Sequence, residues 1–210
     1  MRKALLIAAG AALLAASAQA QDTRVSGALF ISPCGEPFRA PRAEAYPIVQ
    51  WFNGADANHD GKLDIDEMRG DAGRFFKVLD RDSDGVIEDS EVKYYETRVV
   101  PQILVGRLDT GLILVDLQGD LDQAGSRIRH DAPTAEDEVN ADHGAAYFSL
   151  FREPEPVRSA DRDFDQRVTL KEFLAHSDRH FHALDAGNQG YLTLAALPKT
   201  EAERAAKAHR

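Results

Sequence analysis

The chain has 210 residues, of which 35 are acidic and 25 basic, and its formal net charge at pH 7 is -10. A surface of this charge repels phosphates and anionic lipids, so it disfavours nucleic-acid binding and favours cations, divalent ions above all. A single cysteine excludes an intrachain disulfide.

Residues 1–20 have the pattern of a secretory signal peptide. Arg2 and Lys3 precede an apolar run over residues 4–16, and a small-residue triplet ends at Ala20. We expect cleavage after Ala20 and a periplasmic or secreted mature protein. No membrane insertion is expected after cleavage, because no later stretch reaches the roughly 20 apolar residues that a spanning helix needs. An uncleaved anchor helix is the alternative.

Residues 21–42 are expected to form an extended N-terminal segment. An apolar strand at residues 28–31 is followed by Pro33 and Gly35, which end it. We predict that this strand pairs with a β-hairpin further along the chain.

Residues 43–100 are expected to hold two acidic loops with helices around them. Apolar residues recur at spacings of three and four, which predicts a helix before the first loop, one helix joining the two loops, and one ending before Pro101. These residues are Ile48, Trp51, Phe52 and Ala55, then Ile65, Met68, Ala72, Phe75, Phe76 and Leu79, then Val92, Tyr95 and Val99.

The helical pattern changes in residues 101–156. Apolar runs at 103–105 and 112–115, separated by a polar turn, predict a β-hairpin over about 102–121. The polar stretch at 122–144 is expected to be a mobile loop.

Residues 157–210 repeat the organisation of 43–100. The loops start at Asp56 and Asp80, then at Asp161 and Asp185, so the two members of each pair are 24 residues apart. A connecting helix and a short final helix from about residue 194 are expected again. Two prolines in residues 152–156 disfavour a helix, so the third loop is predicted to lack an entering helix.

The first two loops carry a complete set of oxygen ligands. Calcium prefers about six to eight oxygens, and a twelve-residue loop supplies them from its odd-numbered positions, including one backbone carbonyl, and from a closing glutamate. The first loop offers Asp56, Asn58, Asp60, the Lys62 carbonyl, Asp64 and Glu67; the second offers Asp80, Asp82, Asp84, the Val86 carbonyl, Glu88 and Glu91. Crowded carboxylates repel one another without a cation, so these loops are hard to explain as solvated turns.

The third and fourth loops depart from this pattern. The third keeps Asp161, Asp163, Asp165, the Arg167 carbonyl, Thr169 and Glu172. It has Gln166 where the turn favours glycine, and a left-handed backbone there costs about 1–2 kcal/mol, so weaker binding is expected. The fourth has Gly187, Gln189 and Ala196 at ligand positions, so we expect it to hold no calcium and to pair with the third loop. The eighth position is apolar in every loop, and we expect each pair to join there through a short antiparallel bridge.

With the glycine, the apolar eighth residue and the closing glutamate in place, the loops resemble the EF-hand superfamily over about 43–99 and 157–206. The resemblance implies a mainly α fold, with two EF-hand pairs of helix-loop-helix units and a small β-hairpin region between them, and Ca2+ as the bound ion. Residues 30–39 are similar to those of exported bacterial EF-hand proteins of unassigned role.

Other residue groups were weighed as sites. Residues 109–111 are similar to the aspartic-protease triplet, but the sequence has no second copy, so a hairpin turn is the better interpretation. His176 and His180 lie four apart, near His182, and two imidazoles on one face can bind zinc or copper. Because the sequence places no third ligand, we interpret them as a solvated helix face.

The remaining candidates for catalysis are weaker. Asp116, Asp120 and Asp122 are interpreted as hairpin-edge and turn residues, and Cys34 has no identifiable activating partner. We therefore predict a calcium-binding protein that is not an enzyme, acting as a calcium-stabilised sensor or as an interaction module for an unidentified protein partner. A calcium buffer and a dockerin-like adhesion module are the alternatives, and an enzyme with structural calcium is the least favoured.

Overall fold

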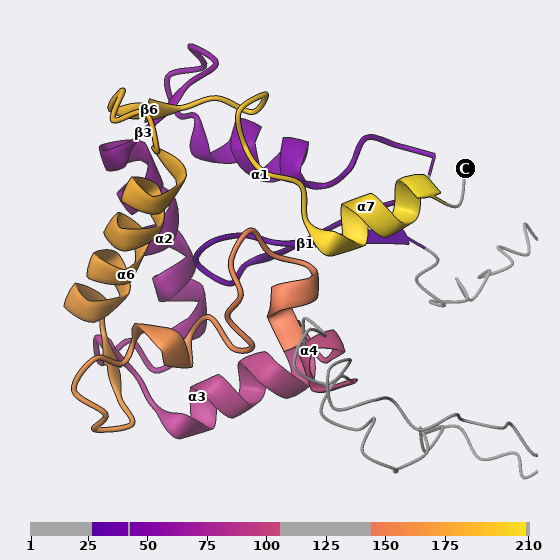
Figure 1. Cartoon of the computed structure of the whole chain (residues 1–210). Helices are drawn as coiled ribbons and strands as arrows, with labels where there is room; N and C mark the ends of the chain where they lie inside the picture. Colours follow the sequence, from indigo (N-terminus) through magenta and orange to yellow (C-terminus); the bar gives the residue numbers. More distant parts are fainter. Residues whose placement is uncertain (1–26, 42, 106–143, 209–210) are drawn as a thin grey trace, which may run out of the picture.

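The computed structural model describes residues 27–41, 43–105 and 144–208 (Figure 1). Over these residues the fold is mainly α, with small antiparallel strand pairs between the helices. None of the helices in these residues is long and apolar enough to cross a membrane. The predicted signal peptide lies outside them, and the predicted division of the chain into segments stays a prediction.

The described chain begins with a β-hairpin. Strand β1 (Gly27–Ile31) pairs antiparallel with β2 (Pro37–Pro41), with Phe30 opposite Phe38. The predicted strand at residues 28–31 is therefore confirmed. In the described residues its partner is β2 and not the predicted hairpin of the middle region, because closing a loop to a partner six residues away costs less entropy than closing one to the middle region. Residues 106–121 of that hairpin lie outside the described residues.

The expected hairpin at 102–121 is also wrong where the structure describes it. Helix α4 (Gln102–Val105) occupies its first residues, directly after Pro101, which suits the first turn of a helix. The rest of that hairpin lies outside the described residues.

The helices around the acidic loops form as their apolar spacing predicts. They are α1 (Ile48–Ala55), α2 (Ile65–Leu79), α3 (Asp89–Tyr94) with its π-helical extension η1 (Tyr95–Val99), and α6 (Leu170–Leu184). The segment before loop three contains 3₁₀ turns, η2 (Gly144–Tyr147) and η3 (Arg158–Ala160). Loop three therefore has no entering α-helix, as predicted.

The last helix begins later than predicted. Helix α7 spans Glu201–Ala208 rather than starting near residue 194. Thr200 lies just before it, and its Oγ1 accepts a hydrogen bond from the Glu203 amide at 3.0 Å. Pro198 lacks an amide hydrogen and disfavours helix at the residue before it, which explains the delayed start.

The four acidic loops pair in crossed order. Strand β3 (Leu63–Asp64) of loop one pairs with β6 (Tyr191–Leu192) of loop four, and β4 (Val86–Ile87) of loop two pairs with β5 (Val168–Thr169) of loop three. The expectation that loop three pairs with loop four, and loop one with loop two, is wrong.

The reason for the crossed pairing is that α2 both leaves loop one and enters loop two. Its 15 residues hold the two loops about 22 Å apart, whereas paired strands lie about 4.8 Å apart. Helix α6 separates loops three and four in the same way. The two helices pack side by side and run antiparallel, so each loop meets the loop at the neighbouring end of the other helix (Figure 1).

The buried apolar residues form two clusters, one around each pair of loops. Phe75, Tyr95 and Phe173 belong to the cluster beside loops two and three. Trp51 and Phe181 belong to the cluster beside loops one and four. Helices α2 and α6 each contribute to both clusters, so they connect the two ends of the core.

The hairpin turn between β1 and β2 gives a test of this packing. Gly35 has φ +95°, and a Cβ added there would lie 3.0 Å from the hydroxyl of Tyr95, which donates to the Gly35 carbonyl at 2.6 Å. We expect Gly35→Ala to lower the free energy of unfolding by at least about 1–2 kcal/mol, because of the left-handed backbone alone. Urea unfolding in saturating calcium measures it.

Gly70 supplies the matched control, because it is exposed on α2 and an added Cβ meets nothing within 4 Å. The same change, Gly70→Ala, is expected to stabilise the fold by about 1 kcal/mol through helix propensity. Shifts of the same sign in both variants would contradict this account of the turn.

Candidate metal sites

Backbone amides shape loop one around its carboxylates. Asp56 accepts hydrogen bonds from the amides of Asp60 and Gly61 at 3.2 and 2.9 Å. The closing Glu67 reaches back across the loop, where its Oε1 accepts from the amide of Ala57 at 3.0 Å. The first and last predicted ligands are therefore drawn to the same side of the loop.

Loop two repeats this arrangement with more negative charge. Asp80 accepts from the amides of Asp84 and Gly85 at 3.1 and 3.0 Å. Carboxylate oxygens of Asp80, Asp82 and Glu91 all lie within 4.8 Å of one another, and Asp80 and Glu91 are buried. Three carboxylates this close repel strongly, and a divalent cation among them removes the repulsion.

Loop three gathers its ligands in the same way despite lacking the glycine. Carboxylate oxygens of Asp161, Asp163 and Glu172 lie within 4.8 Å of one another. Gln166 has φ +70°, so the expected left-handed strain is present. Burial raises the pKa of Glu172, but hydrogen bonds from the backbone and hydroxyl of Thr169 outweigh it and leave the pKa below its usual value.

Loop four keeps the shape without the full set of ligands. Asp185 accepts from the amides of Gln189 and Gly190, both at 2.8 Å, which is the pattern of loops one and two. Gly187 and Ala196, at the third and closing positions, offer no side-chain oxygen. Its role in the structure is to provide β6 for loop one.

The other predicted ligands lie on these same loops. They are the side chains of Asn58, Asp60, Asp64, Asp84, Glu88, Asp165 and Thr169 and the carbonyls of Lys62, Val86 and Arg167. Asp64 also caps α2, because its side chain accepts from the Glu67 amide at 2.8 Å. Their roles as ligands stay predictions.

The two histidines on α6 are not a solvated helix face, and that interpretation is wrong. His176 and His180 are only 3% and 5% exposed, and their rings contact each other. They belong to the buried stripe of α6 that also carries Phe173 and Phe181, and this spacing of three and four is the signal that sequence reasoning missed. Their nearest acidic neighbour is Glu153, from the proline-rich segment before loop three.

This buried cluster has perturbed titration behaviour. Burial raises the pKa of Glu153, but its interactions with His176 and His180 outweigh it and lower the pKa to about 2. Burial also lowers the pKa of His176, since the charged ring is poorly solvated there. The carboxylate is therefore ionised at neutral pH.

The remaining sequence candidates do not form a site in the described residues. Cys34 is buried, and burial raises the pKa of its thiol far above the usual value, so the nucleophilic thiolate is suppressed. Residues 109–111, Asp116, Asp120 and Asp122 lie outside the described residues.

The loop geometry agrees with the comparison with known protein families. Residues 48–70 and 74–93 match the family model described as EF hand, and they span loops one and two with parts of their flanking helices. EF-hand motifs indicate calcium binding in general. No curated protein and no solved structure matches the chain.

The crossed pairing predicts which calcium loop depends on which partner. Leu192 of loop four lies opposite Leu63 of loop one, and Val168 of loop three lies opposite Ile87 of loop two. Leu192→Ala leaves a cavity against Leu63, so we expect it to raise the calcium midpoint of loop one several-fold. Nuclear magnetic resonance titration, following the amide of Gly61, measures the effect.

Val168→Ala is the matched variant, and we expect it to shift the midpoint read at the Gly85 amide of loop two instead. If Leu192→Ala shifted the Gly85 midpoint and left that of Gly61 unchanged, the crossed pairing would be contradicted.

Proposed function

We propose that this chain, which belongs to the EF-hand superfamily through loops one and two, is an exported calcium-binding protein whose bound calcium holds two crossed loop pairs together. The observation that carries the proposal is the convergence of acidic ligands in loops two and three, which are joined by β4 and β5. Loops one to three are the calcium sites, and loop four is the structural partner of loop one.

The donor set favours calcium over other cations. Each of the three loops offers oxygen atoms and a closing glutamate that spans the loop. The Oε1 of that glutamate accepts from the amide after the first aspartate, and its Oε2 accepts from the amide of the ninth residue. Calcium accepts a bidentate carboxylate in a flexible shell, whereas magnesium demands a smaller octahedral one. Soft metals prefer sulfur or imidazole ligands, and the predicted ligand positions of these loops carry neither.

The crossed pairing makes the three sites unequal. Loops two and three share a strand pair, and Arg167 of loop three lies 3.4 Å from Glu88 of loop two. Ordering one of these loops with calcium therefore orders the strand that the other needs, which is positive coupling. Loop one pairs with a loop that lacks ligands, so it binds without a calcium-loaded partner.

The fold supports a structural role for calcium more than the opening of a hidden groove. The apolar faces of α2 and α6 are buried against each other in both core clusters. The large apolar side chains that are exposed in the described residues lie on separate elements or loops: Val78, Tyr94, Tyr147, Phe164 and Leu170. We therefore propose a calcium-stabilised interaction module for a protein partner, rather than an enzyme or a calcium buffer.

Calcium calorimetry on the full chain tests the proposed function. We expect three calcium ions per chain, with Glu67→Gln affecting one site and Glu91→Gln weakening two, because loops two and three are paired. Each site adds about 2.7 kcal/mol of stability when calcium is a hundredfold above its Kd. A chelator should therefore lower the melting temperature by more than about 10 °C. Identical melting curves in chelator and in calcium would rule out a stabilising role.

The strained turn of loop three gives a second test. Gln166→Gly removes a left-handed cost of about 1–2 kcal/mol but adds flexibility to the unfolded chain, so we expect a net gain of roughly 1 kcal/mol in saturating calcium. The reverse change in loop two, Gly85→Gln, introduces that strain at a site where an added Cβ meets nothing within 4 Å. It should destabilise by a similar amount, as measured by urea unfolding. A destabilising Gln166→Gly would refute this interpretation.

A further inference from the structure

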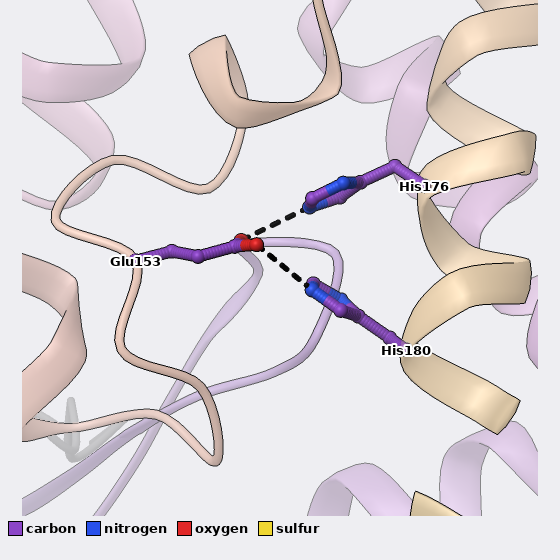
Figure 2. A group of neighbouring side chains, drawn as sticks. All are labelled: Glu153, His176 and His180. Carbon is purple, nitrogen blue, oxygen red and sulfur yellow. Dashed lines mark hydrogen bonds and ion pairs between the residues drawn. The ribbon is translucent and has the colours of Figure 1, made fainter. Parts of the chain in front are cut away.

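Three metal-ligating side chains meet away from the calcium loops. Glu153 Oε2 lies 3.0 Å from His176 Nε2, and Glu153 Oε1 lies 3.1 Å from His180 Nε2 (Figure 2). All three side chains place one ligand atom within 4.8 Å of the others. Both rings are buried, and the Glu153 side chain is 27% exposed, so the cluster faces solvent on the carboxylate side.

The elements that carry these side chains hold them firmly. The histidines are four residues apart on α6, so they project from one face of the helix. Glu153 comes from the segment opposite, where the neighbouring Pro154 carbonyl accepts a hydrogen bond from the Ala145 amide at 2.9 Å. The ring of Phe151 stacks on His180 with centroids 3.7 Å apart, which fixes the plane of the imidazole.

We propose that Glu153, His176 and His180 form a binding site for a divalent transition-metal ion, Zn2+ above all, with a fourth coordination position open to solvent. Ligand atoms about 2.0–2.1 Å from a tetrahedral zinc lie about 3.3 Å apart, so the observed distances of 3.0 and 3.1 Å need to widen only slightly. Imidazole nitrogen suits zinc, copper and nickel, and the all-oxygen loops suit calcium. The two kinds of site would therefore select different metals.

The hydrogen bond behind His180 supports the assignment. Its Nδ1 lies 2.9 Å from the Pro33 carbonyl oxygen, which only accepts, so Nδ1 carries a hydrogen. In the neutral ring the lone pair of Nε2 then faces the Glu153 carboxylate, where two electron-rich atoms repel. A cation between them removes that repulsion, and a backbone carbonyl behind the ring is the usual orienting partner of a metal-binding histidine.

Arg179 sets a condition on metal binding. Its guanidinium donates to His176 Nδ1 at 2.7 Å, so the hydrogen of the neutral ring is on Nε2, the atom that would bind the metal. A metal on Nε2 requires the hydrogen to move to Nδ1 and Arg179 to turn away. Arg179 is exposed, so it has room to do so. Arg179 therefore stabilises the tautomer of His176 that cannot bind the metal, and so it opposes metal binding.

Zinc titration of the full chain, with calcium saturating the loops and a chromophoric chelator as competitor, tests the proposal. We expect one zinc per chain, and we expect Glu153→Gln and His180→Gln each to weaken it on the order of 100-fold. His182→Gln is the matched control, because His182 is exposed two residues further along α6, and it should leave zinc affinity unchanged. Arg179→Met should tighten zinc binding.

Cobalt provides a readout that reports coordination as well as affinity. Co2+ in this site should give the strong visible absorption of a tetrahedral centre, and Glu153→Gln should lose it while keeping calcium-dependent melting. Zinc stoichiometry of zero would overturn the proposal, as would equal zinc affinity in the parent chain, Glu153→Gln and His180→Gln. Loss of zinc binding in Arg179→Met would refute the competition between Arg179 and the metal.

Discussion

The arrangement of the molecule depends on one constraint: an uninterrupted helix joins loop one to loop two, and another joins loop three to loop four. Helices α2 and α6 each have 15 residues, so neither can bring the loops at its two ends together. Each short loop strand has an unpaired edge, and the nearest available partner is the strand of the loop at the adjacent end of the other helix. Antiparallel packing of α2 on α6 supplies both partners at once, β6 for β3 and β5 for β4. Each half of the repeat thus supplies the strands that pair with the loops of the other half. The apolar core accordingly divides into two clusters, one beside each pair of loops.

The same constraint explains why a loop without calcium ligands still has the shape of a calcium loop. Leu192 is buried and lies opposite Leu63, so the fourth loop fills one side of the apolar cluster around Trp51. Asp185 holds the turn through two amide hydrogen bonds, as the first aspartate does in the other loops. Selection on packing alone would keep these two features and would release the remaining ligand positions. The positions that differ are predicted ligand positions in the other loops, and the positions that stay are those that contact protein.

Much of this structure can be predicted from the sequence, because local rules govern it. Apolar spacing places the helices, and ligand spacing places the loops, since both are set within a few residues. The pairing of loops is non-local, and loop similarity suggests the wrong partner. Yet the decisive fact was in the sequence, because a single helix predicted between Leu63 and Ile87 is too long for those residues to meet. The cluster of Glu153, His176 and His180 could not be completed from spacing alone, since its third member lies on a segment whose prolines indicate only the absence of a helix.

The placement of that cluster bears on how the parts of the chain are connected. Its two histidines lie on α6 between the two loop pairs, and the His180 ring is also hydrogen-bonded to the Pro33 carbonyl in the turn of the N-terminal hairpin. Three segments that are distant in sequence therefore meet at the middle of one helix, while loops three and four occupy its two ends. Thr169 caps the start of the helix and Glu172 lies in its first turn, and both are also predicted ligands of loop three. Calcium in loop three would fix the first turn of α6 and with it the two rings, which lie about one and two turns further on. By linkage, if calcium in loop three raises the metal affinity of the cluster by some factor, metal in the cluster must raise the calcium affinity of loop three by the same factor.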